Sequence, residues 1–203
     1  MLLSERFLIY PPENVGNRRK KHKAGRSAKI SKEIFANLNR KSRQEKIEKI
    51  KEKALTTDDI NNFLNNADNF LGVFASDELC KLRILSFPAF IISNLDISSS
   101  EGSHWISLRV CEKSVEIFDS LGFDRKLWGK YPIGLQTFLA RYQNSHSFFI
   151  SPILQPISTQ DCGFYCIFFV LYRKLFTFSE CVSYFSKILT LNHNILINKL
   201  KNY

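Results

Sequence analysis

Residues 161–172 have the sequence DCGFYCIFFVLY and form the most apolar stretch of the chain. The apolar character continues to Phe176 and covers nearly every position. This predicts a helix over Cys162–Phe176 that is buried on all sides. Such a helix must be surrounded by other elements, so we expect it to lie at the centre of the folded body.

Two strands joined by a tight turn are predicted before this helix. Apolar and polar residues alternate over His104–Val110 and again over Ser114–Asp119, with Glu112-Lys113 as the turn between them. The same kinds of pattern predict further strands over Phe87–Leu95 and Ser147–Leu154, a helix capped at Thr57 that runs through Leu64, and helices over Leu135–Tyr142 and Phe178–Leu191.

The register of this hairpin brings a histidine close to a carboxylate. A two-residue turn pairs Ile106 with Asp119, which leaves His104 one diagonal step away on the same face of the sheet. One interpretation is a base with its orienting group, because a carboxylate fixes the imidazole tautomer and favours the imidazolium. The alternative is purely structural, since aspartate is common where a strand turns.

Cys162 opens the apolar helix and is a candidate nucleophile. A thiol at a helix N-terminus lies beside unpaired N–H groups and in a favourable dipole field, and both stabilise a thiolate. Gly163 would permit close approach of a substrate backbone. The alternative is a small apolar cysteine that only packs, which is also our interpretation of Cys166, with redox pairing to Cys162 as the less favoured possibility.

Gln155 is a candidate oxyanion donor. It lies seven residues before Cys162 in a loop framed by Pro152 and Pro156. A side-chain amide can donate to a developing oxyanion together with a backbone N–H. A solvated loop glutamine is the alternative, and Gln160 is a competitor of the same type that lies too near Cys162 in sequence to reach across a site.

The positive charge of the chain is confined to its first quarter. Of 203 residues with a net charge of +10, residues 1–53 hold 16 Lys and Arg against 6 Asp and Glu, whereas residues 54–203 hold 13 of each. We therefore predict a basic arm over 1–54, largely disordered or partly helical, and a globular domain over 55–203. The arm could bind DNA by releasing counterions, or it could be a solvated tail or a nuclear localisation signal at Arg18–Lys23.

The five cysteines form an odd, scattered set without a CxxC pair, which argues against a structural zinc site. The first residues lack the apolar core of a secretory signal, so we expect reduced thiols in an intracellular compartment. The longest apolar run, Cys166–Tyr172, is too short to span a bilayer, and no membrane association is expected.

Several of these residues lie in segments that resemble the adenain-like cysteine proteases of adenoviruses, Polinton/Maverick elements and adintoviruses, and more distantly the SUMO-specific ubiquitin-like proteases. The resemblance covers about residues 55–180 and is carried by NFLGVF at 69–74, GSHW at 102–105, IFDSLGF at 117–123, Gln155, and CGFYC at 162–166. The spacing from Gln155 to Cys162 is like that of the adenovirus enzyme, whereas Asp161 before the cysteine is more like the SUMO group.

The resemblance implies a papain-like α+β fold, with a mixed sheet flanked by helices and a buried central helix that starts at the catalytic cysteine. It implies that Cys162 is the nucleophile, His104 the general base, Asp119 its orienting group and Gln155 an oxyanion donor. Adenain has glutamate at the position of Asp119 and the SUMO proteases have aspartate, which keeps the role. No cofactor is required for the chemistry. The cysteine with which adenain binds its activating viral peptide has no clear counterpart here, and the basic arm keeps DNA open as an activator.

The predicted function is that of a cysteine endopeptidase that matures capsid precursor polypeptides of a virus or transposable element, in the nucleus or the virion. One alternative is a protease that removes a ubiquitin-like modifier of the SUMO type. That activity would need a surface for a folded modifier rather than a narrow cleft for short peptide motifs. A second alternative is a nucleic-acid-binding protein without enzymatic activity.

Overall fold

The structure is a computed structural model that describes residues 40–42, 44–49 and 53–203. Contacts divide the chain after Lys41, and the unit considered below is Ser42–Tyr203. Most of the predicted basic arm, including Arg18–Lys23, lies outside the described residues. The separate arm and its boundary near residue 55 therefore stay predictions.

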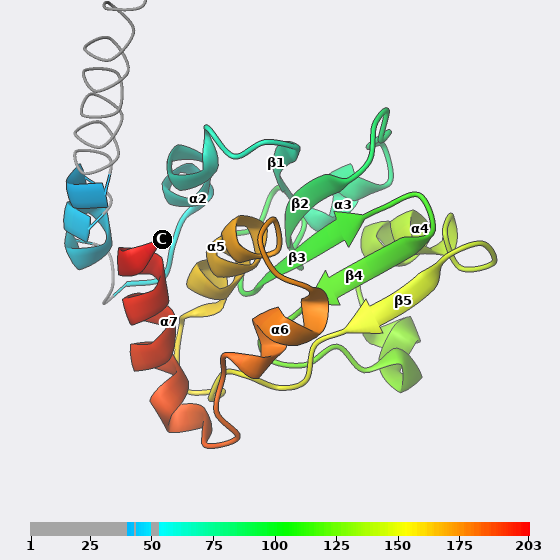
Figure 1. Cartoon of the computed structure of the whole chain (residues 1–203). Coiled ribbons are helices and arrows are strands. Elements are labelled where there is room, and N and C mark those ends of the chain that lie inside the picture. Colours follow the sequence, from blue (N-terminus) through cyan, green and yellow to red (C-terminus); the bar gives the residue numbers. More distant parts are fainter. Residues whose placement is uncertain (1–39, 43, 50–52) are drawn as a thin grey trace, which may run out of the picture. The chain divides into compact units, whose positions relative to one another are not determined.

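The described unit is an α+β structure built on a five-stranded mixed sheet (Figure 1). The strands follow one another in the order β1 (Phe70–Phe74), β2 (Ala89–Asn94), β3 (Trp105–Val110), β4 (Ser114–Phe118) and β5 (Ser147–Ile150). The two outer pairs, β1 with β2 and β4 with β5, are parallel, and the two inner pairs are antiparallel. This confirms the predicted mixed sheet.

Helices lie on both faces of the sheet (Figure 1). They are α2 (Thr57–Leu64), α3 (Ser76–Leu79), α4 (Ile133–Ala140), α5 (Cys162–Tyr172), α6 (Phe178–Ser183) and α7 (Asn192–Asn202), with short 3₁₀ helices η1 (Arg125–Lys130) and η2 (Leu189–Leu191). Every residue of α5 is buried, so the predicted central helix is confirmed, but it ends at Tyr172 rather than at Phe176. None of the helices in the described part of the chain is long and apolar enough to cross a membrane.

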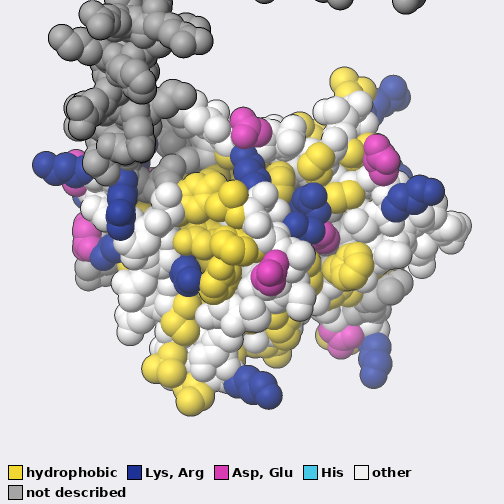
Figure 2. All heavy atoms as spheres, viewed as in Figure 1, with side chains coloured by type: hydrophobic (Ala, Val, Ile, Leu, Met, Phe, Trp, Pro, Cys, Tyr) yellow, Lys and Arg dark blue, Asp and Glu magenta, His cyan; other side chains and the backbone are white. Residues whose placement is uncertain are grey.

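Alternate residues of the strands supply two hydrophobic cores. Phe90, Ile92 and Phe118 face α5, while their neighbours Ile91 and Ile117 belong to the core that includes α4. The period of two along each strand produces this division. On the face seen in Figure 2, Lys and Arg side chains are interspersed with Asp and Glu, and hydrophobic side chains gather near α5 and α6.

Several element boundaries differ from the sequence prediction. The cap of α2 is Thr56, whose hydroxyl accepts from the N–H of Asp59, so the cap lies one residue earlier than predicted. Strand β5 ends at Ile150, because the next residue, Ser151, turns its hydroxyl to the backbone of Asp119.

The predicted helix over Phe178–Leu191 ends at Ser183. Beyond it, the backbone of Ser186 is held by the side chain of Asn192, which fixes a bend in place of further helical turns. Strand β1 and helices α3 and α7 were not predicted.

Residues 44–49 are helical, and Ile47 is fully buried in the core around α5. The amide of Gln44 donates to the carbonyl of Lys201 near the end of α7, over 3.3 Å. Glu48 forms an ion pair with the ammonium group of Lys201. This segment therefore packs on the last helix.

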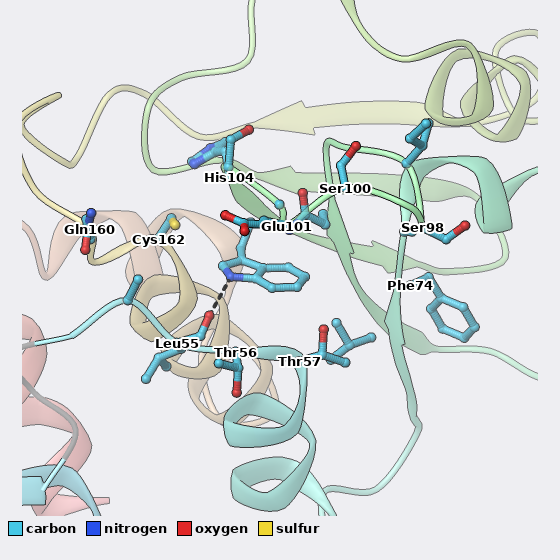
Figure 3. Close-up of a pocket in the computed structure, with 18 of the residues that line it drawn as sticks. Leu55, Thr56, Thr57, Phe74, Ser98, Ser100, Glu101, His104, Gln160 and Cys162 are labelled. Atoms are coloured by element: carbon cyan, nitrogen blue, oxygen red, sulfur yellow. Dashed lines mark hydrogen bonds between the residues drawn. The ribbon is translucent and has the colours of Figure 1, made fainter.

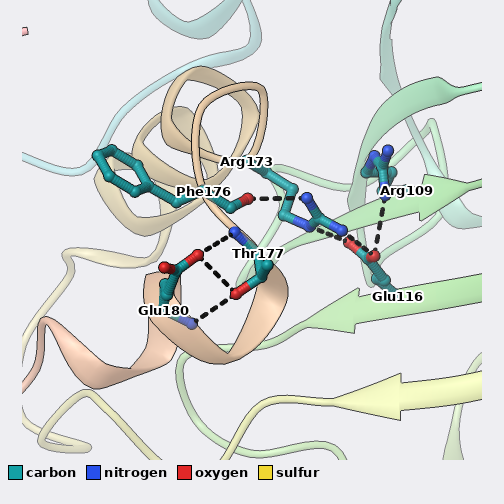
Figure 4. Close-up of polar contacts among 6 residues, drawn as sticks. All are labelled: Arg109, Glu116, Arg173, Phe176, Thr177 and Glu180. Carbon is teal, nitrogen blue, oxygen red and sulfur yellow. Dashed lines mark hydrogen bonds and ion pairs between the residues drawn. The ribbon is translucent and has the colours of Figure 1, made fainter.

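A buried glutamate joins two strands to the end of α5 (Figure 4). Glu116 accepts from Arg173 through both carboxylate oxygens, at 2.7 and 2.8 Å, and from Arg109 at 2.9 Å. Arg173 also donates to the carbonyl of Phe176, so the chain turns away after Tyr172 rather than extending the helix. Thr177 and Glu180 then cap α6 reciprocally.

Replacing Glu116 by glutamine should lower the free energy of unfolding by about 3–5 kcal/mol, because two arginine side chains would lose their buried counter-charge. Urea unfolding of the full chain measures this change. The control is Glu112→Gln in the exposed turn between β3 and β4, which should stay within about 0.5 kcal/mol of wild type. Equal unfolding midpoints for the two variants would contradict this account of the network.

Candidate active site

The structure places His104 beside Asp119, as the hairpin register predicts. Pairing of β3 with β4 runs from Val110 opposite Val115 to Ser107 opposite Phe118, and one further step sets Ile106 opposite Asp119. His104 precedes β3 by one residue, and its Nε2 lies 2.7 Å from Asp119 Oδ1. The side chains are buried, with residue exposures of 9% for His104 and 2% for Asp119.

Asp119 is fixed by the backbone around it. Its Oδ1 also accepts from the N–H of Leu121 at 2.9 Å. Its own N–H donates to the hydroxyl of Ser151, and that hydroxyl donates to its carbonyl, at 2.9 and 2.8 Å. These bonds hold the carboxylate on one side of the imidazole, which leaves Nδ1 as the nitrogen free of the carboxylate.

Cys162 is the first residue of α5 and lies at the cleft that His104 also lines. Its exposure is 8%, so the thiol is accessible from the cleft but otherwise enclosed. The side chain of Cys162 lies near enough to His104 to raise the pKa of the imidazole. The structure thus brings together three residues that are far apart in sequence.

The environment of His104 favours the imidazolium. Burial of the ring lowers its pKa, but hydrogen bonds with Asp119 and then with Cys162 raise it, and the pKa of His104 rises from 6.5 to about 9. A charged imidazole next to a sulfur stabilises the thiolate form of that sulfur. At neutral pH, His104 is therefore protonated.

Gln155 is held at the opposite end of the loop from Cys162. Its Oε1 accepts from the hydroxyl of Ser120 at 2.7 Å, and its Nε2 donates to the carbonyl of Thr159 at 2.7 Å. An amide nitrogen carries two hydrogens, so one remains for a ligand in the cleft that Gln155 lines. Gln160 lines the same cleft, and Figure 3 shows it near Cys162.

The cleft has a volume of about 820 Å³, and Figure 3 shows Cys162 and His104 on one side of it. Trp105 lines it and donates from Nε1 to the carbonyl of Leu55 at 3.0 Å. We expected the small Gly163 to admit a substrate backbone, but Leu55 occupies that side. A Cβ on Gly163 would lie 2.9 Å from the Cβ of Leu55, so the glycine is needed for this packing.

The remaining cysteines have no part in this arrangement. All five are free thiols, so no bond pairs Cys162 with Cys166. Burial raises the pKa of Cys166 well above its usual value, and this residue packs in the core as predicted. Among the described residues, no group of three or more His, Cys, Asp or Glu side chains could hold a metal ion.

The sequence did not single out the residues that support the site. Ser120, Ser151 and Thr159 hold Gln155 and Asp119, and Asn192 and His193 contact the loop that leads to Cys162. Only Ser120 has a local signal, because it directly follows Asp119. The others are brought in by contacts that no short pattern encodes.

Replacing Asp119 by asparagine should lower the pKa of His104, because the hydrogen bond to the carboxylate is the largest of the contributions that raise it. NMR titration of the imidazole protons measures the pKa in the full chain. Cys162→Ala should lower the pKa of His104 by less than Asp119→Asn does.

The folded-state pKa of His104 is above its unfolded value, so the folded state binds this proton more tightly. The stability from the pair should be fully present below pH 6.5 and lost as pH rises through about 9. The titration contradicts this account if the His104 pKa of the wild type is near 6.5.

Comparisons with known proteins neither support nor contradict the resemblance to adenain-like and SUMO-specific proteases. No protein-family model matches the chain, and no curated protein matches it. The similarity to adenain-like and SUMO-specific proteases therefore stays a prediction that depends on the segments quoted from the sequence. What the structure adds is the geometry: His104, Cys162 and Gln155 line one cleft, and Asp119 is bonded to His104 without lining the cleft itself.

Proposed function

We propose that this protein is a cysteine endopeptidase with a papain-like fold of the adenain and SUMO-protease type. The observation that carries the proposal is the position of His104, whose imidazole bonds to Asp119 at 2.7 Å and lines the same cleft as the nearby Cys162. Acyl transfer to a cysteine needs a nucleophile, a base next to it and a carboxylate that orients the base. Cys162, His104 and Asp119 are arranged in space in that order.

The reaction follows from the positions of these groups. The sulfur of Cys162 attacks the scissile carbonyl, and the oxyanion accepts hydrogen bonds from the N–H of Cys162 and from Gln155. His104 then gives its proton to the leaving amine, and the C–N bond breaks to leave a thioester. Water attacks the thioester with His104 as the base, which releases the acid and restores the thiol.

The charge of the cleft favours a polypeptide over a nucleic acid as its occupant. Asp58, Glu78 and Glu101 line it, and the described residues of the lining include no lysine or arginine. A phosphate backbone would be repelled here, whereas an extended peptide supplies N–H groups and basic side chains. In Figure 3, Glu101 lies between Cys162 and the Ser98–Ser100 part of the bordering loop.

The finer proposals depend on the resemblance of sequence. They are the maturation of viral or element-encoded capsid precursors, a location in the nucleus or virion, and activation by DNA through the basic arm. Residues 1–39 lie outside the described part of the chain. A salt-dependent DNA-binding measurement on the whole protein tests the arm separately from the cleft.

Labelling with iodoacetamide at neutral pH tests the thiol. Mass spectrometry of the full chain should find Cys162 modified faster than the other four cysteines, because only Cys162 adjoins an imidazolium. The rate at Cys162 should fall by about tenfold or more in His104→Ala. The matched control is Cys111→Ala, in which the labelling of Cys162 should be unchanged.

Hydrolysis of an unfolded protein, reduced casein, then tests the activity. Cleavage by wild type, its loss in Cys162→Ala and its retention in Cys111→Ala are the expected results. Uniform, slow labelling of all five cysteines with no casein cleavage would defeat the proposal. Cleavage of a folded modifier fusion without any cleavage of casein would replace it by the deconjugating activity.

A further inference from the structure

The loop between Gln155 and Cys162 carries both donors of the proposed oxyanion site, one at each end. Residues 155–161 contain neither helix nor strand, so the loop does not fix the distance between these donors by its own secondary structure. A donor that is displaced by about 1 Å loses much of its effect on an oxyanion. Contacts from outside the loop must therefore set its shape.

The first end of the loop is held by two hydrogen bonds to one backbone carbonyl. The carbonyl of Leu154 accepts from the side-chain amide of Asn192 at 2.8 Å and from the hydroxyl of Tyr165 at 2.9 Å. The backbone N–H groups of Leu154 and Gln155 both donate to the carbonyl of Ser120, at 2.8 and 2.9 Å. Gln155 is thus attached to the end of β4 and to the start of α7.

The second end of the loop depends on a single side-chain contact. Asp161, next to Cys162, is only 6% exposed, and its Oδ1 lies 3.0 Å from Nδ1 of His193. Its side chain does not cap α5, and its Oδ2 is buried without a partner among the described residues. A buried carboxylate with one partner takes its orientation from that partner.

Asn192 and His193 are consecutive residues in the first turn of α7, and that turn is itself anchored. The side chain of Asn192 is fully buried, accepts from the N–H of Ser186 at 2.7 Å and donates to the carbonyl of Ser186 at 3.0 Å. Farther along α7, the carbonyl of Lys199 accepts from the hydroxyl of Tyr172, the last residue of α5. The turn is therefore fixed relative to α5.

We propose that the first turn of α7 sets the geometry of the oxyanion site, with His193 and Asn192 as positioning residues that grip the two ends of the loop. This inference rests on the proposed acyl-transfer function of Cys162. Neither residue lines the cleft, so both act through Asp161 and Leu154 and touch no substrate. His193 is the better residue to vary, because its side chain is 39% exposed and its loss leaves no large cavity.

Two reagents separate positioning from a general effect on the thiol. p-Nitrophenyl acetate acylates Cys162: the S–C bond forms, an oxyanion develops, and the ester C–O bond breaks with release of p-nitrophenolate. Iodoacetamide alkylates the same sulfur by displacing iodide and develops no oxyanion. The ratio of the acylation rate to the alkylation rate at Cys162, measured by mass spectrometry, therefore reports on the oxyanion site alone.

His193→Ala should lower this ratio by about tenfold, with the alkylation rate within about twofold of wild type. His193→Asn should recover most of the ratio, because an asparagine amide nitrogen can take the place of Nδ1 and donate to Asp161. The control is Asn194→Ala, the exposed neighbour on the same turn, which should leave both rates unchanged. Thermal unfolding of each variant identifies any loss of the fold.

An unchanged ratio in a folded His193→Ala protein would overturn the inference, as would an equal fall in both rates. Failure of His193→Asn to recover the ratio would do the same, since the effect would then not depend on a donor to Asp161. A wild-type protein in which Cys162 shows no selective alkylation would instead defeat the proposed function itself, so the two failures are distinguishable.

Discussion

The burial of α5 on every side is the constraint on which the rest of the structure depends. Strands β2 to β4 cover one side of this helix, and α2, α6 and α7 contribute to the core around it. Each fully buried phenylalanine contributes about 1.5–3 kcal/mol through its removal from water. Phe164, in the first turn of α5, is fully buried. Withdrawing that turn would cost more than the 1.36 kcal/mol that corresponds to a tenfold change in population. Packing therefore holds the first turn of α5, which carries Cys162, against the rest of the domain.

The same packing explains why the start of β3 and the end of β4 meet the start of α5. Trp105 and Phe118 face α5 from adjacent strands, and each has a polar neighbour in sequence, His104 or Asp119. His104 lies just before β3 and Asp119 just after β4, so these polar groups lie at the margin of the core rather than inside it. Burying a charged pair costs free energy by desolvation, and removing one partner costs more than the pair contributes. The bonds from Asp119 to the N–H of Leu121 and to Ser151 offset that cost and fix the carboxylate for its partner.

The local part of this arrangement was predictable from the sequence, and the long-range part was not. The proximity of His104 and Asp119 follows from a period of two and a two-residue turn, and the structure has that register. The buried helix follows from its composition. By contrast, the contacts of Asp161 with His193 and of Leu154 with Asn192 join residues 32 and 38 positions apart. Such contacts depend on where α7 packs along α5. The sequence of α7 has an ordinary amphipathic pattern, which does not indicate the residues that its side chains contact.

The wall of the cleft opposite His104 comes from the segment before α2, so the site is not made by the sheet and α5 alone. Leu55 packs against Gly163 and accepts from Trp105, and Thr56 beside it caps α2 through Asp59. A side chain larger than hydrogen at position 163 would meet Leu55 at a distance that Cβ atoms do not adopt, so the helix start and this wall constrain each other. Displacing Leu55 would break the hydrogen bond from the indole of Trp105, the residue that follows His104. The position of the imidazole thus depends on both β4, through Asp119, and the segment that enters the domain, through Trp105.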